Sequence, residues 1–159
     1  IAGVVNAYPE PAQLGVDRWL ATVAAYNMVQ GPCIVIDAGT ALTADFVANG
    51  GRHLGGQIAP GFRLLEELLV RSTGLRTDQG EIKTGPQNNT ADCLLAGMYC
   101  MMHGFVRQVC EEGLSIMGDD PVVVLSGGDA PLVQDALTLP HTVVDDLVFK
   151  GLALACPLS

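Results

Sequence analysis

Hydrophobic positions in the first third of the chain predict one helix followed by three short strands. From Val16 to about Met28 the apolar residues recur every three or four positions, which predicts an amphipathic helix. The run from Cys33 to Ile36 is short and continuously apolar, which is typical of a buried strand. Two more strands, Ala41 to Ala48 and His53 to Ala59, flank Asn49-Gly50-Gly51, a strong hairpin signal. We therefore expect an antiparallel meander.

The rest of the chain predicts helices that alternate with short strands. Pro60-Gly61 opens a helix that runs to about Arg71, and Ser72 to Asn89 is polar and predicts a long loop. Thr90 is expected to cap a long helix from Ala91 to about Glu112. The remaining elements are a strand at Pro121 to Leu125, a short helix to about Leu137, a strand at Thr142 to Val144 and a last helix from Asp145 to about Ala155.

A meander followed by alternating helices and strands resembles a ribonuclease-H-like α/β lobe. That lobe is the half-unit of the superfamily of actin-like ATPases, which includes actin, Hsp70 and the sugar kinases. We expect residues 1–159 to form a single lobe of this kind, with the helix after Gly15 as an N-terminal connecting helix. The chain opens at Ile1 in what appears in the sequence as the middle of a strand, so we also expect an upstream portion to be missing.

Composition narrows the classes of function. With 17 acidic against 8 basic residues the net charge is −9, and such a surface repels phosphate backbones, which argues against nucleic-acid binding. The sequence has neither an uninterrupted apolar stretch long enough for a membrane span nor a signal peptide, so we expect a cytoplasmic protein. The 5 cysteines form no CxxC pair, and we interpret them as buried or inert thiols in a reducing compartment. The 3 histidines lack metal-ligand spacing, so no zinc site is expected.

Two glycine-containing turns are candidates for phosphate binding. In Asp37-Ala38-Gly39-Thr40 a buried strand ends in a carboxylate, and the turn amides and the threonine hydroxyl can donate to phosphate oxygens. Asp37 can hold a cation that offsets phosphate charge. Gly127-Gly128-Asp129 follows the valine-rich strand and resembles a nucleotide-contacting loop. Ordinary turns, with Asp37 bonded to its own backbone, are the alternative for both.

Two further elements complete the candidate site. Gly55-Gly56-x-Ile58-x-Pro60-Gly61 places two glycines in a strand, where they are costly unless backbone or ligand comes near, and then opens a helix whose N-terminus suits an anion. In Gly15-Val16-Asp17-Arg18 the aspartate can take a proton from a substrate hydroxyl, and the arginine can clamp a substrate carboxylate. A bulge with a helix start, and a helix cap with a solvated ion pair, are the structural alternatives.

These four elements, in this order and spacing, resemble type III pantothenate kinase. The family pattern is Tyr-x(6)-Gly-x-Asp-Arg, then Asp-x-Gly-Thr-Ala-x-Thr-x-Asp, Gly-Gly-x-Ile-x-Pro-Gly, a threonine that opens a long helix, and a Gly-Gly-Asp loop. No single motif is specific, but the joint pattern spans nearly the whole chain. The matching positions are Tyr8, Gly15 to Arg18, Asp37 to Asp45, Gly55 to Gly61, Thr90, and Gly127 to Asp129.

The resemblance implies an ATP-dependent phosphotransferase that converts pantothenate to 4'-phosphopantothenate, the first step of coenzyme A biosynthesis. It implies that Asp17 is the general base and that Asp37 holds a monovalent cation, potassium or ammonium, with magnesium as a further cofactor. It also implies a homodimer with the pantothenate pocket near the subunit interface. The implied ATP contacts are Gly39, Thr40, Gly127 and Gly128, and the implied pantothenate contacts are Tyr8, Gly15, Val16, Asp17, Arg18 and Thr90.

One departure from the family pattern limits what this chain is expected to do. The family's other ATP-binding turn, Asp-x-Gly-Asn-Thr at its extreme N-terminus, has no counterpart here. We therefore expect the N-terminal ATP-binding lobe to be absent and phosphorylation by this chain alone to be impaired. The alternatives are another kinase of the superfamily, such as a sugar kinase, and an accessory or regulatory domain that keeps the fold without catalysis.

Overall fold

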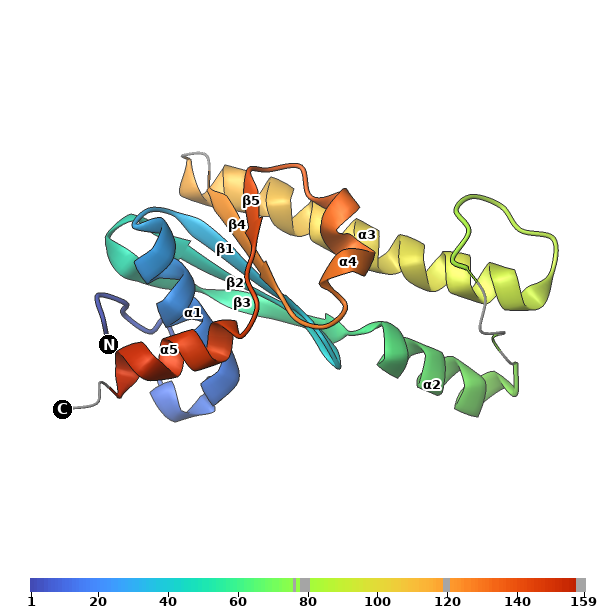
Figure 1. The fold of residues 1–159 in the computed structure, drawn as a ribbon, viewed down its shortest axis with the longest axis horizontal. Coiled ribbons are helices and arrows are strands. Elements are labelled where there is room, and N and C mark those ends of the chain that lie inside the picture. Colours follow the sequence, from blue (N-terminus) through green and yellow to red (C-terminus); the bar gives the residue numbers. More distant parts are fainter. Residues whose placement is uncertain (76, 78–80, 119–120, 157–159) are drawn as a thin grey trace.

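The computed structural model describes residues 1–75, 77, 81–118 and 121–156, which form one mixed sheet covered by helices on both faces (Figure 1). The sheet has 5 strands in the order β3-β2-β1-β4-β5. The strands are β1 (Cys33–Ala38), β2 (Ala41–Ala48), β3 (Arg52–Pro60), β4 (Val122–Ser126) and β5 (His141–Val143).

The predicted meander is confirmed, because β1 pairs antiparallel with β2 and β2 pairs antiparallel with β3. β4 then lies parallel to β1 on the other side, and β5 lies parallel to β4. Central strands covered on both faces explain the continuous apolar runs in β1 and β4. The carboxyl ends of these two parallel strands meet at one edge of the sheet, where Asp37 is paired with Ser126.

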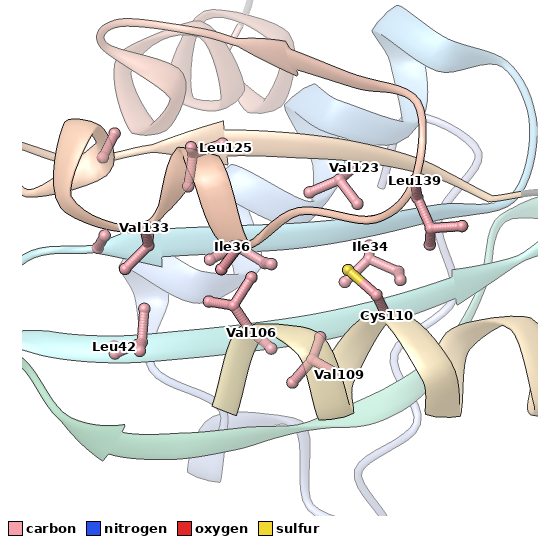
Figure 2. Packing of buried hydrophobic residues seen from close by; sticks show 14 of the residues in the cluster. Ile34, Ile36, Leu42, Val106, Val109, Cys110, Val123, Leu125, Val133 and Leu139 are labelled. Atoms are coloured by element: carbon pink, nitrogen blue, oxygen red, sulfur yellow. The ribbon is translucent and has the colours of Figure 1, made fainter. Parts of the chain in front are cut away.

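Each face of the sheet has its own apolar core. On one face α1 (Val16–Val29) and α5 (Leu147–Ala155) lie against each other and against the sheet (Figure 1). On the other face α3 (Thr90–Met117) and α4 (Ala130–Val133) pack on a larger core, in which Val106, Val109 and Cys110 meet Ile34 and Ile36 (Figure 2). Alternation along β1 sends Ile34 and Ile36 to this face and Val35 to the other.

Two helices extend past the sheet as an arm. α2 (Phe62–Thr73) is amphipathic, yet none of its residues is buried. α3 has 28 residues and is therefore about 42 Å long. Its N-terminal half projects with α2 beyond the carboxyl end of β1 (Figure 1). We call these two projecting segments, α2 and the N-terminal half of α3, the α2–α3 arm.

Several element ends differ from the sequence-based expectations for physical reasons. Asn89, not Thr90, caps α3, because its side-chain oxygen accepts the amide of Asp92 at 3.0 Å. α3 continues past Glu112, because the missing side chain of Gly113 lets the helix pack on Ile34, and it ends at Gly118 with a left-handed φ of 72°.

The remaining differences are small. α5 begins at Leu147 rather than Asp145, after Asp146 in a left-handed conformation with φ 56°. Of the cysteines, Cys33 and Cys110 are buried as expected, and Cys93, Cys100 and Cys156 are exposed. The hairpin signal at 49–51 forms a 3₁₀ turn, and two more such turns lie at Pro11–Gln13 and Gln134–Ala136. No helix in the described ranges combines the length and apolarity of a membrane span.

Candidate active site

Three of the predicted motifs meet at the turn that follows β1. Gly39 donates its amide to the carbonyl of Ala41 at 3.0 Å, which closes the turn between β1 and β2. Gly61, at the start of α2, donates to the carbonyl of Thr40 at 3.0 Å. Asp129 donates to the carbonyl of Ala38 at 2.8 Å. The β1–β2 turn, the Gly127–Asp129 loop and the N-terminus of α2 are therefore joined by backbone hydrogen bonds.

Two glycines are required for this close approach. A Cβ on Gly127 would lie 2.3 Å from the carbonyl oxygen of Ala38 and 2.4 Å from Oδ1 of Asp37. A Cβ on Gly61 would lie 1.9 Å from the carbonyl oxygen of Gly39. Real side chains do not tolerate such contacts with backbone, so these positions require glycine for packing reasons. By contrast, nothing lies within 4 Å of a Cβ placed on Gly128.

A cleft of about 570 Å³ opens beside this turn, between the carboxyl ends of β1 and β4 and the start of α5. Asp37, Gly127 and Gly128 were expected at a ligand site, and all three line this cleft. Thr40 is exposed on the neighbouring turn. The sequence reasoning did not single out the other lining residues as functional; they are Ser126, Asp145, Asp146, Leu147, Val148 and Phe149.

Asp37 lies in this cleft as a half-buried carboxylate. In the described part of the chain no hydrogen bond reaches its side chain. Burial raises its pKa above the ordinary aspartate range, and the negative charge of Asp17 raises it further. Asp17 is exposed in the first turn of α1. The structure therefore brings the two aspartates close enough for their charges to repel each other.

Arg18, next to Asp17 on α1, is held by Asp45 of β2. Its Nε donates to Oδ2 of Asp45 at 2.8 Å and its Nη2 donates to Oδ1 at 2.6 Å, a bidentate pair. The bond to Asp45 is the main reason that the pKa of Arg18 is raised. Its Nη1 donates to the hydroxyl of Tyr8 at 3.3 Å. The guanidinium that was expected to clamp a substrate carboxylate is thus paired with a carboxylate of its own chain.

His53, which the sequence offered only as one of three scattered histidines, completes this group. Its Nε2 lies 2.9 Å from Oδ1 of Asp45, and its ring stacks on Tyr8 with centroids 6.2 Å apart. A Cβ on Gly56 would lie 2.4 Å from both Oδ1 of Asp45 and Nη2 of Arg18. We call Tyr8, Arg18, Asp45 and His53 the buried junction. The spacing of residues 8, 18, 45 and 53 along the chain does not indicate that their side chains meet.

The other expected pantothenate contacts lie in two places. Gly15 and Val16 line a surface hollow of about 560 Å³ beside the start of α1, together with Trp19. Thr90 is exposed as the first residue of α3, on the α2–α3 arm. The arm projects away from α1 (Figure 1). Within this chain, Thr90 is therefore not brought together with Tyr8 or the start of α1.

Comparisons with known proteins bear on this arrangement. The family model described as "Type III pantothenate kinase" matches residues 1–112. The type III pantothenate kinase of Pseudomonas putida is 41% identical over 165 residues, which covers 100% of this chain and 66% of the relative. The chain thus spans 66% of the length of that curated relative.

Solved structures support the fold alone. A Campylobacter jejuni protein described as a conserved member of the Baf family of transcriptional activators matches with a TM-score of 0.66 and 24% identity, covering 95% of this chain and 66% of that one. Acetate kinase of Porphyromonas gingivalis matches with a TM-score of 0.57 and 11% identity, covering 94% and 58%. The similarity to acetate kinase supports the expected actin-like ATPase fold.

Proposed function

The chain belongs to the type III pantothenate kinase family, and from that premise we propose that it forms the larger part of an ATP-dependent pantothenate kinase. The reaction transfers the γ-phosphoryl group of ATP to the primary hydroxyl of pantothenate, and its product, 4'-phosphopantothenate, enters coenzyme A biosynthesis. The observation that carries this proposal is the electrostatic coupling of Asp17 to Asp37 beside a glycine-lined cleft. One carboxylate belongs to the acceptor side of the reaction and the other to the phosphate side.

Asp17 is the general base of the proposed reaction. It is exposed in the first turn of α1, where a substrate hydroxyl can approach it from solvent. Phosphoryl transfer passes through a loose transition state, so the base needs only to orient the hydroxyl and accept its proton late in the step. An ordinary carboxylate is sufficient for that role.

The phosphate side of the site is built mainly from backbone. Gly39 and Thr40 form the β1–β2 turn, and Gly127 and Gly128 form the loop that touches it. Loops of this kind present amides to phosphate oxygens and allow the ligand to come close to the chain. We assign the ATP phosphates to these four residues, because the turn packs against the loop whose two glycines line the cleft.

A cation fits beside Asp37. Its half-buried carboxylate accepts no hydrogen bond in the described residues, and a bound cation would offset the cost of its charge. The described residues contain no group of three or more His, Cys, Asp or Glu side chains that could hold a metal. Potassium, ammonium or magnesium would therefore bind through Asp37, backbone carbonyls and substrate phosphates. Such a cation supplies neutralisation of the phosphate charge.

Tyr8, Gly15, Val16 and Arg18 form the acceptor side in this proposal. Gly15 and Val16 line the hollow at the start of α1, and Val16 is 66% exposed, which leaves an apolar surface for a substrate to cover. Tyr8 is half-buried and linked to Arg18. Tyr8 is therefore partly accessible, and it lies next to Arg18, the residue that follows the proposed base.

In this proposal Thr90 belongs to the acceptor side of a second subunit, because the α2–α3 arm carries it away from α1 of its own chain (Figure 1). The arm has the surface that self-association needs. α2 buries none of its residues, and its Leu68 is 47% exposed. An apolar groove of about 250 Å³, lined by residues that include Leu65, Met101 and Phe105, lies between α2 and α3. We therefore propose a homodimer through the arm, with Thr90 donated to the partner's pantothenate pocket.

We place the reaction in the cytoplasm. All 5 cysteines are free in the structure, and 3 of them are exposed, a pattern suited to a reducing compartment. The substrates, ATP and pantothenate, are small anions that need only local positive or amide groups, which is compatible with a net charge of −9.

The decisive experiment is a coupled assay of ADP release with pantothenate as acceptor, on the chain joined to the expected N-terminal lobe. We expect turnover with pantothenate and none with hexoses. Asp17→Asn should lower kcat by about 10²- to 10⁴-fold, because the variant cannot accept the proton. Asp135→Asn, which removes an exposed carboxylate outside the cleft, is the matched control. Phosphorylation of a sugar in preference to pantothenate would sink the proposal.

A further inference from the structure

The buried junction lies outside the cleft, and the proposed reaction does not use two of its members. Asp45 and His53 are each 2% exposed, and neither can touch a substrate. We propose that Asp45 and His53 are positioning residues for the acceptor side, which fix Tyr8 and the first turn of α1. This inference rests on the proposed function, because the acceptor side is defined by it.

The carboxylate of Asp45 is the centre of the arrangement. Oδ2 accepts from Nε of Arg18 at 2.8 Å, and Oδ1 accepts from Nη2 of Arg18 at 2.6 Å. Oδ1 also lies 2.9 Å from Nε2 of His53. With three donors on two oxygens in a buried place, the Asp45 side chain has no freedom to turn. The start of α1 is thereby fastened to β2.

The backbone selects one form of His53. The amide of Ala7 donates to Nδ1 at 3.4 Å, so Nδ1 must be the unprotonated nitrogen. Nε2 then carries the hydrogen and donates to Asp45. The charges of Arg18 and Asp45 balance each other.

Tyr8 is held at two points by this pair. Its ring stacks on the ring of His53 with an angle of 16° between the planes, and its hydroxyl accepts from Nη1 of Arg18 at 3.3 Å. The two residues that contact Tyr8, His53 and Arg18, are themselves both bonded to Asp45. Loss of His53 should therefore release Tyr8 and loosen the first turn of α1, which carries Asp17 and Arg18, while the cleft around Gly127 stays in place.

The sheet is shaped to accommodate the junction. The register of β2 and β3 shifts between Phe46 and Val47, where Gly55 has a φ of 114°. Asp45 then faces Gly56, whose missing side chain leaves room for the ion pair. A residue with a side chain at position 56 would collide with both charged groups. The glycine pair in this strand is thus explained by the junction rather than by a ligand.

The test compares His53→Ala and His53→Gln with wild type in the kinase assay, using the chain joined to the expected N-terminal lobe. Glutamine can place an amide donor where Nε2 lies and keep the bond to Asp45. We expect His53→Ala to raise the KM for pantothenate about tenfold, which corresponds to about 1.4 kcal/mol, with an unchanged KM for ATP. His53→Gln should restore most of the affinity for pantothenate. His141→Gln, at an exposed position on β5, is the control.

The possible results distinguish the positioning role of His53 from the proposed kinase function. An active wild type in which His53→Ala leaves the KM for pantothenate unchanged overturns the positioning role alone. A variant in which both KM values rise together shows that the junction supports the fold in general, and this also overturns it. A wild type that does not phosphorylate pantothenate overturns the proposed function. Emission from Trp19, the single tryptophan and a half-buried neighbour of Arg18, provides a readout without catalysis, and it should shift in His53→Ala but not in His53→Gln.

Discussion

The buried junction and the cleft both hold aspartates, but the two sites treat their carboxylates in opposite ways. In the junction, Asp45 is buried and receives three hydrogen-bond donors. In the cleft, Asp37 is half-buried and receives none from the described residues, while Asp17 repels it. The junction supplies its own donors, whereas the described residues supply none to the Asp37 carboxylate. The fold accounts for the first aspartate, and the ligand site proposed above would account for the second.

The largest expected effect is on stability when the junction is broken. Asp45→Ala leaves the Arg18 guanidinium buried without its partner, which should lower the free energy of unfolding by about 3–5 kcal/mol. Urea denaturation followed by circular dichroism measures this loss. Asp145→Ala, on the exposed rim of the cleft, should change it by less than about 0.5 kcal/mol. Equal losses in the two variants would remove the distinction between the sites.

A substitution in the cleft backbone should rank second. Gly127→Ala places a methyl group 2.3 Å from the carbonyl oxygen of Ala38 and strains a φ of 98°, which should cost about 2–4 kcal/mol. Gly128→Ala meets no atom within 4 Å and should be nearly neutral. Thermal unfolding of both variants tests this, and a tolerated Gly127→Ala would show that the loop and the β1–β2 turn are not packed as described.

Removal of the Asp37 charge should stabilise the unliganded protein. The pKa of Asp37 is raised, so its ionised form disfavours the folded state, and Asp37→Asn should gain up to about 1 kcal/mol at neutral pH. The gain is modest because solvent still screens a half-buried group. It should be complete above the raised pKa and disappear as the pH falls below the ordinary aspartate range. A lower free energy of unfolding for Asp37→Asn than for wild type at pH 7 would contradict this expectation and would mean that Asp37 stabilises the fold, as Asp45 does.

The smallest expected effect concerns Tyr8. Tyr8→Phe removes only the acceptor of a 3.3 Å hydrogen bond from Arg18, so the protein should lose about 0.5–1 kcal/mol. Tyr26→Phe on α1 is the control, because the Tyr26 hydroxyl makes no hydrogen bond in the described residues. A larger loss than in Asp45→Ala would mean that the phenol, rather than the carboxylate, organises the junction.

The order of elements was predictable from sequence because local signals agree with the tertiary structure. β2 was expected at Ala41 to Ala48 and lies there, bounded by the Gly39-Thr40 turn and the glycines after Asn49. α1 begins at Val16, after Gly15, as its apolar spacing predicts. These signals depend on residues a few positions apart, so they can be interpreted without knowing which distant residues they contact.

The junction was not predictable, because it depends on the register of two strands. His53 meets Asp45 only because the bulge at Gly55 moves it within reach of that carboxylate. A search for ligand spacing passes over a histidine whose partner is a single carboxylate on another strand. Asp146 and Phe149 were passed over for a related reason: parallel pairing of β4 with β5 brings the start of α5 beside Asp37.

The central proposal, that Asp17 and Asp37 belong to one site, is tested most directly by the pKa of Asp37 in the Asp17→Asn variant. The measurement is a pH titration of the Asp37 carboxyl carbon by NMR, and it needs neither substrate nor activity. The account predicts that the pKa of Asp37 falls toward the ordinary range while staying above it, since burial is the larger cause of its shift and remains. A pKa of Asp37 that is the same in the variant and in wild type would contradict the account.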